Sequence, residues 1–133
     1  MKILGLKVIG HDTGAALITD DRIVVIQQER LDRKKYSSNF PIESINYCLK
    51  EAGLDSLEKI DAVAIEQFEK SADGVIKSLV QHNLWDIIKD KVYFIPHHDA
   101  HAASAFFCSP FEKSAIMVVD NAGMTTLDKN GKL

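Results

Sequence analysis

The chain has 133 residues, of which 16 are Lys or Arg, 19 are Asp or Glu and 46% are apolar, and its formal net charge is −3. This is the composition of one globular domain; it excludes the disordered and collagen-like classes, and the length provides for one core but not two. The mild acidity gives no electrostatic footprint for nucleic acid, and no apolar run reaches the roughly 20 residues of a membrane-spanning helix.

The N-terminal apolar stretch does not complete a secretion signal, because charged and polar residues interrupt it from Lys7 onward. We therefore expect a cytoplasmic protein. Cys48 and Cys108 lack metal-type spacing and fall in apolar helical patterns, so we expect reduced, buried thiols.

Three short strands open the predicted fold. Apolar runs cover residues 3–9, 15–19 and 23–27, and turn residues separate them at positions 12–14 and 20–21. Such closely spaced runs predict an antiparallel meander.

Helices and strands then alternate along the chain. Pro41 opens a helical pattern that ends before Gly53, and Ser71 precedes a second pattern that continues to Ile87. Short strands are predicted at 61–66 and 92–95, and a last helix is predicted from His97 or His98 to Phe107. Three strands followed by helix, strand, helix, strand and helix predict an α/β fold, with a mixed sheet and helices on both faces. This order is that of the ribonuclease H-like fold, which the actin-like (ASKHA) superfamily uses in duplicate.

The end of the sequence resembles its beginning. A strand-like run at 114–120, a turn at 121–123, a strand at 124–127 and an Asn-Gly turn repeat the pattern of residues 12–21 about 108 positions later. We therefore predict a first subdomain at 1–113 and the opening hairpin of a second at 114–133, although two unrelated hairpins could match by chance. Because a lone hairpin is marginal in water, we expect a longer protein or a homodimer formed through this hairpin.

Two histidines and an aspartate form a candidate metal site. His97 and His101 lie four residues apart, which places both rings on one face of a helix, and Asp120 ends the next predicted strand. Iron(II), manganese and zinc all suit two imidazoles and one carboxylate. An incidental histidine pair remains the alternative.

Further polar residues cluster at the predicted turns. Arg30 and Lys35 belong to a basic run after the third strand, which is either a clamp for a phosphate-like anion or a solvated loop. Asp12 lies in a glycine-containing turn suited to a phosphate, and His11 beside it is a candidate for acid–base catalysis, although both also suit an ordinary surface turn.

Three segments, ILGLKVIGHDTGAALITDDRIV, QERLDRKKYSSNFP and HHDAHAASAFFCSPF, occur in this order between residues 3 and 111. They resemble the N-terminal part of the O-carbamoyltransferase family, which includes nodulation protein U and the tobramycin and cephamycin carbamoyltransferases. The resemblance implies an actin-like domain that transfers a carbamoyl group to the hydroxyl of a small-molecule acceptor. It also implies a YrdC-like domain further along, which makes carbamoyladenylate from carbamoyl phosphate and ATP.

The resemblance assigns roles to individual residues. The metal ligands of the family fall on His97, His101 and Asp120, which favours Fe(II), with zinc or manganese as alternatives. Basic residues of the carbamoyl-nucleotide pocket fall on Arg30 and Lys35, and a first-turn histidine falls on His11. The family usually has a glycine and then an acidic residue after the strand that ends in Asp120. This chain instead has Asn121 and Met124.

Two other functions remain open at this stage. The chain could be a truncated, non-catalytic module that binds metal or a protein partner, or a fragment of an actin-like ATPase or kinase. The histidine pair argues against the ATPase or kinase, because those sites hold magnesium through carboxylates and substrate phosphates. As an isolated segment, the chain is expected to lack carbamoyltransferase activity.

Overall fold

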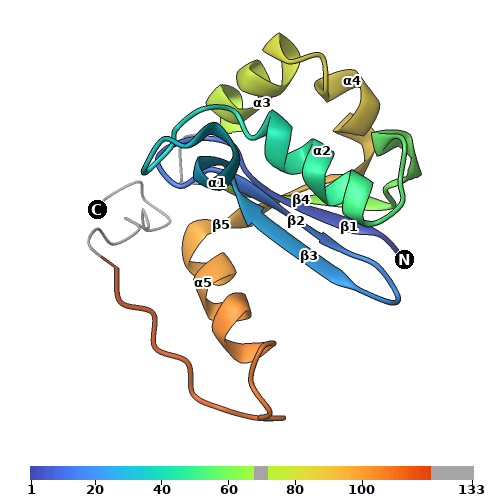
Figure 1. Ribbon diagram of the computed structural model, residues 1–133. Coiled ribbons are helices and arrows are strands. Elements are labelled where there is room, and N and C mark those ends of the chain that lie inside the picture. The colour runs from blue at the N-terminus through green and yellow to red at the C-terminus, as the bar shows by residue number, and fades with distance from the viewer. Residues whose placement is uncertain (68–71, 121–133) are drawn as a thin grey trace.

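A five-stranded mixed sheet is the centre of the computed structural model, which describes residues 1–67 and 72–120 (Figure 1). Its strands are β1 (Ile3–Lys7), β2 (Gly14–Ile18), β3 (Ile23–Gln27), β4 (Ala62–Gln67) and β5 (Val92–Pro96). The strand order is β3-β2-β1-β4-β5, in which β1, β2 and β3 are antiparallel neighbours and β4 runs parallel to both β1 and β5. The predicted meander and mixed sheet are confirmed.

Helices cover both sides of the sheet. They are α1 (Gln28–Asp32), α2 (Ile42–Glu51), α3 (Ala72–Gln81), α4 (Trp85–Ile88) and α5 (His97–Phe106), with 3₁₀ turns at Leu57–Lys59 and Lys89–Lys91. Figure 1 shows α2, α3 and α4 above the sheet and α5 below it, against the end of β5. The prediction of helices on both faces is therefore correct.

The core lies between the sheet and helices α2 and α3. Alternate residues of β1 and β4, including Leu4 and Ile65, are fully buried on this face and belong to one cluster with Ile45 and Leu79 of the helices. Period-two burial of this kind is what an amphipathic strand produces. The opposite face is more open on the meander side, where Ile23 and Val25 of β3 remain 70% and 69% exposed.

One glycine within the sheet is required by close packing. A Cβ atom at Gly14 would lie only 2.8 Å from the backbone oxygen of Ile26 on the neighbouring strand. Glycine therefore allows β2 and β3 to approach where the chain turns from β1.

The helical stretch predicted to continue to Ile87 is two helices instead of one. Asn83 has a positive φ of 58° between α3 and α4, a conformation that asparagine tolerates better than most residues and that ends a helix. The break turns Ile88 into the core and leaves Ile87 40% exposed. Ser71, the predicted cap, lies outside the described residues.

Two predictions near the end of the chain differ from the structure. Residues 114–120 form no strand, and the exposed side chains of Met117 and Val119 fit the absence of a pairing neighbour among the described residues. The rest of the predicted hairpin lies outside those residues. Both cysteines are free, but only Cys48 is buried; Cys108 is exposed because α5 has already ended at Phe106.

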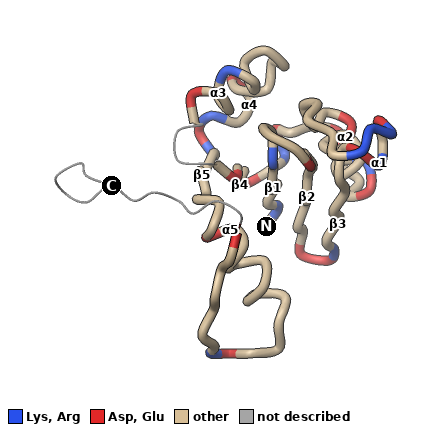
Figure 2. Tube along the Cα trace, turned by 90° about the vertical axis from the view of Figure 1, so that its left-hand side faces the viewer, with Lys and Arg blue, Asp and Glu red and all other residues tan. Residues whose placement is uncertain are grey.

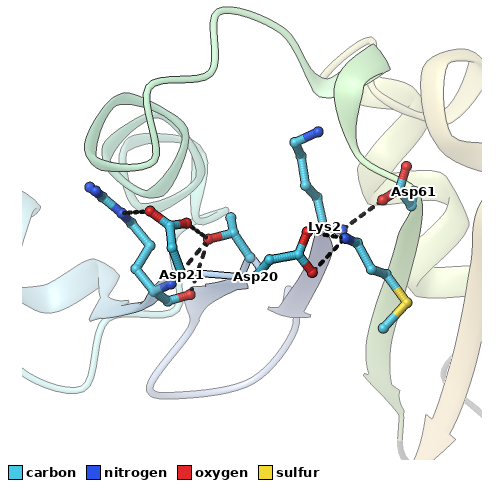
Figure 3. Close-up of polar contacts among 7 residues, drawn as sticks. Lys2, Asp20, Asp21 and Asp61 are labelled. Carbon is cyan, nitrogen blue, oxygen red and sulfur yellow. Dashed lines mark hydrogen bonds and ion pairs between the residues drawn. The ribbon is translucent and has the colours of Figure 1, made fainter.

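Polar contacts fasten the end of the sheet where β1 begins (Figure 3). The Met1 amino group lies 2.7 Å from a carboxylate oxygen of Asp20 in the β2–β3 turn, and the Lys2 amide donates to Asp61 at 2.6 Å. Thr19 donates to Asp21 within the same turn. Among the described residues, no helix is both long enough and apolar enough to cross a membrane.

Candidate metal centre and anion site

The topology brings the candidate residues to one end of the sheet, where several strands finish. Strands β1, β4 and β5 are parallel, and β3 shares their direction because two antiparallel pairings relate it to β1. Their carboxyl ends therefore lie along the same end of the sheet, which is where α/β proteins commonly bind ligands. The His11 turn follows β1, Arg30 follows β3 in α1, and His97 begins α5 directly after β5.

His97, His101 and Asp120 converge on one point. The Nε2 atom of His97 lies 2.7 Å from Oδ2 of Asp120 and 3.0 Å from Nε2 of His101, and His101 Nε2 lies 3.6 Å from the same Asp120 oxygen. One ligand atom from each residue lies within 4.8 Å of the others. His97 is buried, whereas His101 and Asp120 are reached by solvent.

These separations suit a shared divalent ion. Ligand atoms 2.0–2.1 Å from one metal are about 2.9 Å apart in octahedral geometry and about 3.4 Å apart in tetrahedral geometry. The three observed separations, 2.7, 3.0 and 3.6 Å, bracket this range. Two imidazole nitrogens and one carboxylate oxygen are also a donor set that iron(II), zinc and manganese accept. Distance and chemistry therefore both fit a metal.

Glu66 contacts His97 from the other side of the ring. Its Oε1 lies 2.6 Å from His97 Nδ1, and both side chains are largely buried. An ionised carboxylate only accepts hydrogen bonds, so Glu66 favours a proton on Nδ1. With a metal ion between His97, His101 and Asp120, the Nε2 lone pair would then be the ligand. Sequence reasoning missed Glu66, although it ends a predicted strand; nothing local indicated a partner 31 residues away.

His98 takes no part in the group. Its Nε2 atom is buried and makes no hydrogen bond within the described part of the chain. The ring centroid lies 5.7 Å from that of His97, and His98 is absent from the metal-ligand cluster. The spacing argument, which placed His97 and His101 on one helix face, agrees with this arrangement.

The basic run lines a separate candidate anion site at α1. A depression of about 260 Å³ is lined by Glu29, Arg30, Arg33 and Lys35. Figure 2 shows the concentration of Lys and Arg at α1 and the turn that follows it. Arg33, which sequence reasoning did not single out, has a positive φ of 62° at the end of α1. The left-handed residue reverses the chain, so that residues on both sides of it line the depression.

Hydrogen bonds hold the loop that carries these cations. Asp32 accepts hydrogen bonds from Ser37 and Asn39, and the Ser37 bond in particular lowers the pKa of the Asp32 carboxyl from its usual value. Thr13 fastens the loop to the β1–β2 turn, because its amide and hydroxyl donate to the backbone oxygens of Ser37 and Asn39. The loop that carries the basic residues is thus held in place by hydrogen bonds from Ser37, Asn39 and Thr13.

A buried glutamine at the start of α1 adds further hydrogen bonds that hold this segment. Gln28 is fully buried, and its Oε1 accepts from both the amide and the hydroxyl of Ser44 on α2. Its Nε2 donates to Glu43. The first residues of the basic segment form a short helix anchored to α2, and the segment is thus not a loop throughout; its role as an anion clamp stays a prediction.

His11 and Asp12 occupy the β1–β2 turn. His11 Nδ1 lies 2.6 Å from Asp12 Oδ2, and the His11 ring is 75% exposed. Gly10 and Asp12 both have positive φ, at 81° and 59°, which gives the turn its tight shape. An imidazole oriented by a carboxylate is a common acid–base arrangement.

The structure does not bring all candidate residues into contact. Residues Arg30 and Lys35 follow β3, and His97 follows β5, so four strand spacings separate them, roughly 19 Å at the usual interval of about 4.8 Å. His11 follows the central strand β1, between the two groups. Figure 2 accordingly shows α1 and α5 toward opposite sides of the sheet.

Comparison with known sequences shows where this chain has relatives. A family model described as the carbamoyltransferase N-terminus matches residues 2–83 and 71–129. An uncharacterised protein of Synechocystis, sll1178, is 33% identical over 91% of this chain, and the nodulation protein NolNO of Sinorhizobium fredii is 30% identical over 85%. The chain spans only 25% and 20% of the lengths of these two relatives.

Comparison with solved structures supports the fold. YeaZ from Pseudomonas aeruginosa matches 80% of this chain and 49% of its own with a TM-score of 0.55 and 18% sequence identity. A likeness at this identity concerns the fold alone, and it supports the actin-like class predicted from the order of strands and helices.

Proposed function

The chain belongs to the carbamoyltransferase family, whose N-terminal part it matches, and from this membership we propose that it forms the metal centre and the donor-binding site of an ATP-dependent O-carbamoyltransferase. The convergence of His97 Nε2, His101 Nε2 and Asp120 Oδ2 carries the proposal. In this proposal, carbamoyl phosphate and ATP give carbamoyladenylate, and the carbamoyl group passes to the hydroxyl of a small acceptor. The remainder of an actin-like domain and a YrdC-like domain would complete the enzyme.

The three ligands would hold a divalent ion, Fe(II) by preference and Zn²⁺ or Mn²⁺ as alternatives. Such an ion would supply Lewis-acid chemistry, which polarises a carbonyl or lowers the pKa of a bound hydroxyl. His97 and His101 contribute neutral nitrogens and Asp120 one negative charge, which leaves coordination positions for oxygen ligands. The partial exposure of His101 and Asp120 gives a ligand access to this point.

The cations at α1 would bind the anionic donor. Arg30 and Arg33 can each present a planar guanidinium to phosphate oxygens, and Lys35 adds a point charge. Asp12 would position His11, and the unprotonated His11 ring would take the proton of the acceptor hydroxyl. A bond then forms between the acceptor oxygen and the carbamoyl carbon, while the bond from that carbon to the phosphate oxygen of the adenylate breaks and AMP leaves.

A metal-binding module without catalysis is the second candidate. The observation that favours it is the open face of the meander, where Ile23 and Val25 are largely exposed and would suit contact with another protein surface. Such a module would bind a metal ion but would not bind carbamoyl phosphate at α1. Donor binding therefore distinguishes the two functions.

The test is calorimetric titration of the protein with carbamoyl phosphate, a probe that carries the same carbamoyl phosphate group as the adenylate donor. We expect Arg30→Gln combined with Lys35→Gln to weaken binding at least tenfold, because each lost charge-assisted contact is worth about 1.5–3 kcal/mol. Lys50→Gln, an exposed lysine near the end of α2, is the matched control and should bind as the parent does. Equal affinity in all three proteins would make the basic segment an ordinary surface and favour the non-catalytic module.

A further inference from the structure

We propose that Glu66 is a positioning residue that fixes the tautomer and the ring orientation of His97, so that Nε2 and not Nδ1 binds the metal. This inference rests on the metal centre of the proposed function. It concerns a residue outside the ligand cluster of His97, His101 and Asp120.

The position of Glu66 follows from the sheet. Val63 and Ile65 of β4 are fully buried in the core, so Glu66, the next residue, lies on the opposite face of the strand, where α5 begins. In the parallel pairing of β4 with β5, Glu66 is level with Ile95, and Gln67 with Pro96. His97 follows Pro96 directly. Two regular strands thus place the Glu66 carboxylate beside the His97 ring.

The two edges of the His97 ring have different partners. Glu66 Oε1 lies 2.6 Å from Nδ1, whereas Asp120 and His101 lie 2.7 and 3.0 Å from Nε2. Because the two nitrogens point away from each other, Glu66 is on the far side of the ring and cannot be a ligand of the same ion. Its carboxylate accepts a hydrogen bond from Nδ1–H, which keeps the proton on Nδ1 and leaves the Nε2 lone pair for the metal.

Burial makes this hydrogen bond effective. The side chains of His97 and Glu66 are 10% and 17% exposed, so water competes little for the Nδ1 proton. His101 is more than half exposed, and within the described residues its Nδ1 atom makes no hydrogen bond to a carboxylate. A carboxylate behind a metal-binding histidine both orients the ring and increases its basicity, and removal of such a partner typically costs 10- to 100-fold in metal affinity. His97 is therefore the preorganised ligand of the pair.

The first test is Zn²⁺ affinity, measured by competition with a chromophoric chelator. We expect Glu66→Ala to lose on the order of 10- to 100-fold in affinity. Glu66→Gln, whose amide oxygen can still accept a hydrogen bond from Nδ1–H, should recover much of this loss. Glu58→Ala is the matched control, because Glu58 is exposed in the 3₁₀ turn before β4 and should leave the affinity unchanged. Thermal unfolding of the metal-free proteins checks that each variant is folded.

The second test needs no variant and has a readout that a purely structural role would not move. Long-range ¹H–¹⁵N correlation spectra of the Zn²⁺-loaded parent should show His97 with the proton on Nδ1 and the metal on Nε2. The opposite assignment, or equal Zn²⁺ affinity in the parent and Glu66→Ala, would overturn the role of Glu66 while the metal centre stands. A parent protein that binds no Zn²⁺ would overturn the metal centre itself and this role with it.

Discussion

At the scale of single residues, the two cysteines of this chain differ in burial. Cys48 is fully buried on α2, with its Sγ near the backbone oxygens of Ala15 and Val24, whereas Cys108 is exposed beyond α5. Loss of water around the thiolate raises the pKa of the Cys48 thiol from 9.0 to about 11. Cys48 therefore stays protonated and unreactive under conditions in which an exposed thiol reacts.

We expect iodoacetamide at about pH 8 to modify Cys108 alone in the native protein and both thiols after denaturation. Intact-mass measurement before and after denaturation counts the added groups. Because folding raises the Cys48 pKa, its contribution to stability is complete below pH 9 and is lost as the pH rises through about 11. Rapid modification of Cys48 in the native state would show that α2 does not seal it.

At the scale of elements, regular patterns predicted most of the fold. The short apolar runs predicted as strands are β1 and β4 in the structure, and the four-residue spacing of His97 and His101 places both rings toward Asp120. These predictions succeeded because strand and helix periodicity are local properties of the sequence. The same periodicity could not detect the break at Asn83, where a single left-handed residue divides one apolar pattern into two helices.

Elements that depend on distant partners were not predictable in this way. Helix α1 has five residues, too few to be stable alone, and Gln28 anchors it through Ser44, 16 residues later. The role of Glu66 likewise depends on its contact with His97, 31 residues away. Conversely, residues 114–120 have a strand-like pattern but no pairing neighbour among the described residues, and they form no strand. Tertiary contacts decide all three cases.

At the scale of the whole molecule, the sheet separates the two groups of site residues. The candidate anion site follows one outer strand and the candidate metal centre the other, roughly 19 Å apart at about 4.8 Å per strand. Substitutions this far apart and without shared partners usually have additive effects, within about 0.5 kcal/mol. The two groups should therefore contribute independently to ligand binding within this chain.

This independence can be measured with a double-mutant cycle on carbamoyl phosphate binding. We expect Arg33→Gln to weaken affinity by the same factor, within about twofold, in the parent and in the His101→Ala background. Calorimetric titration of the four proteins provides the comparison. A tenfold difference between the two factors would mean that the anion site and the metal centre share a ligand and lie closer together than the strand order places them.

The central claim is that His97, His101 and Asp120 hold a divalent metal, and elemental analysis of anaerobically purified protein tests it most directly. The parent and His98→Ala should each contain a stoichiometric amount of one divalent metal, because His98 lies outside the ligand cluster. His97→Ala should contain none, because it removes the buried ligand between Asp120 and His101. Equal metal content in all three proteins, or no metal in the parent, would contradict the account.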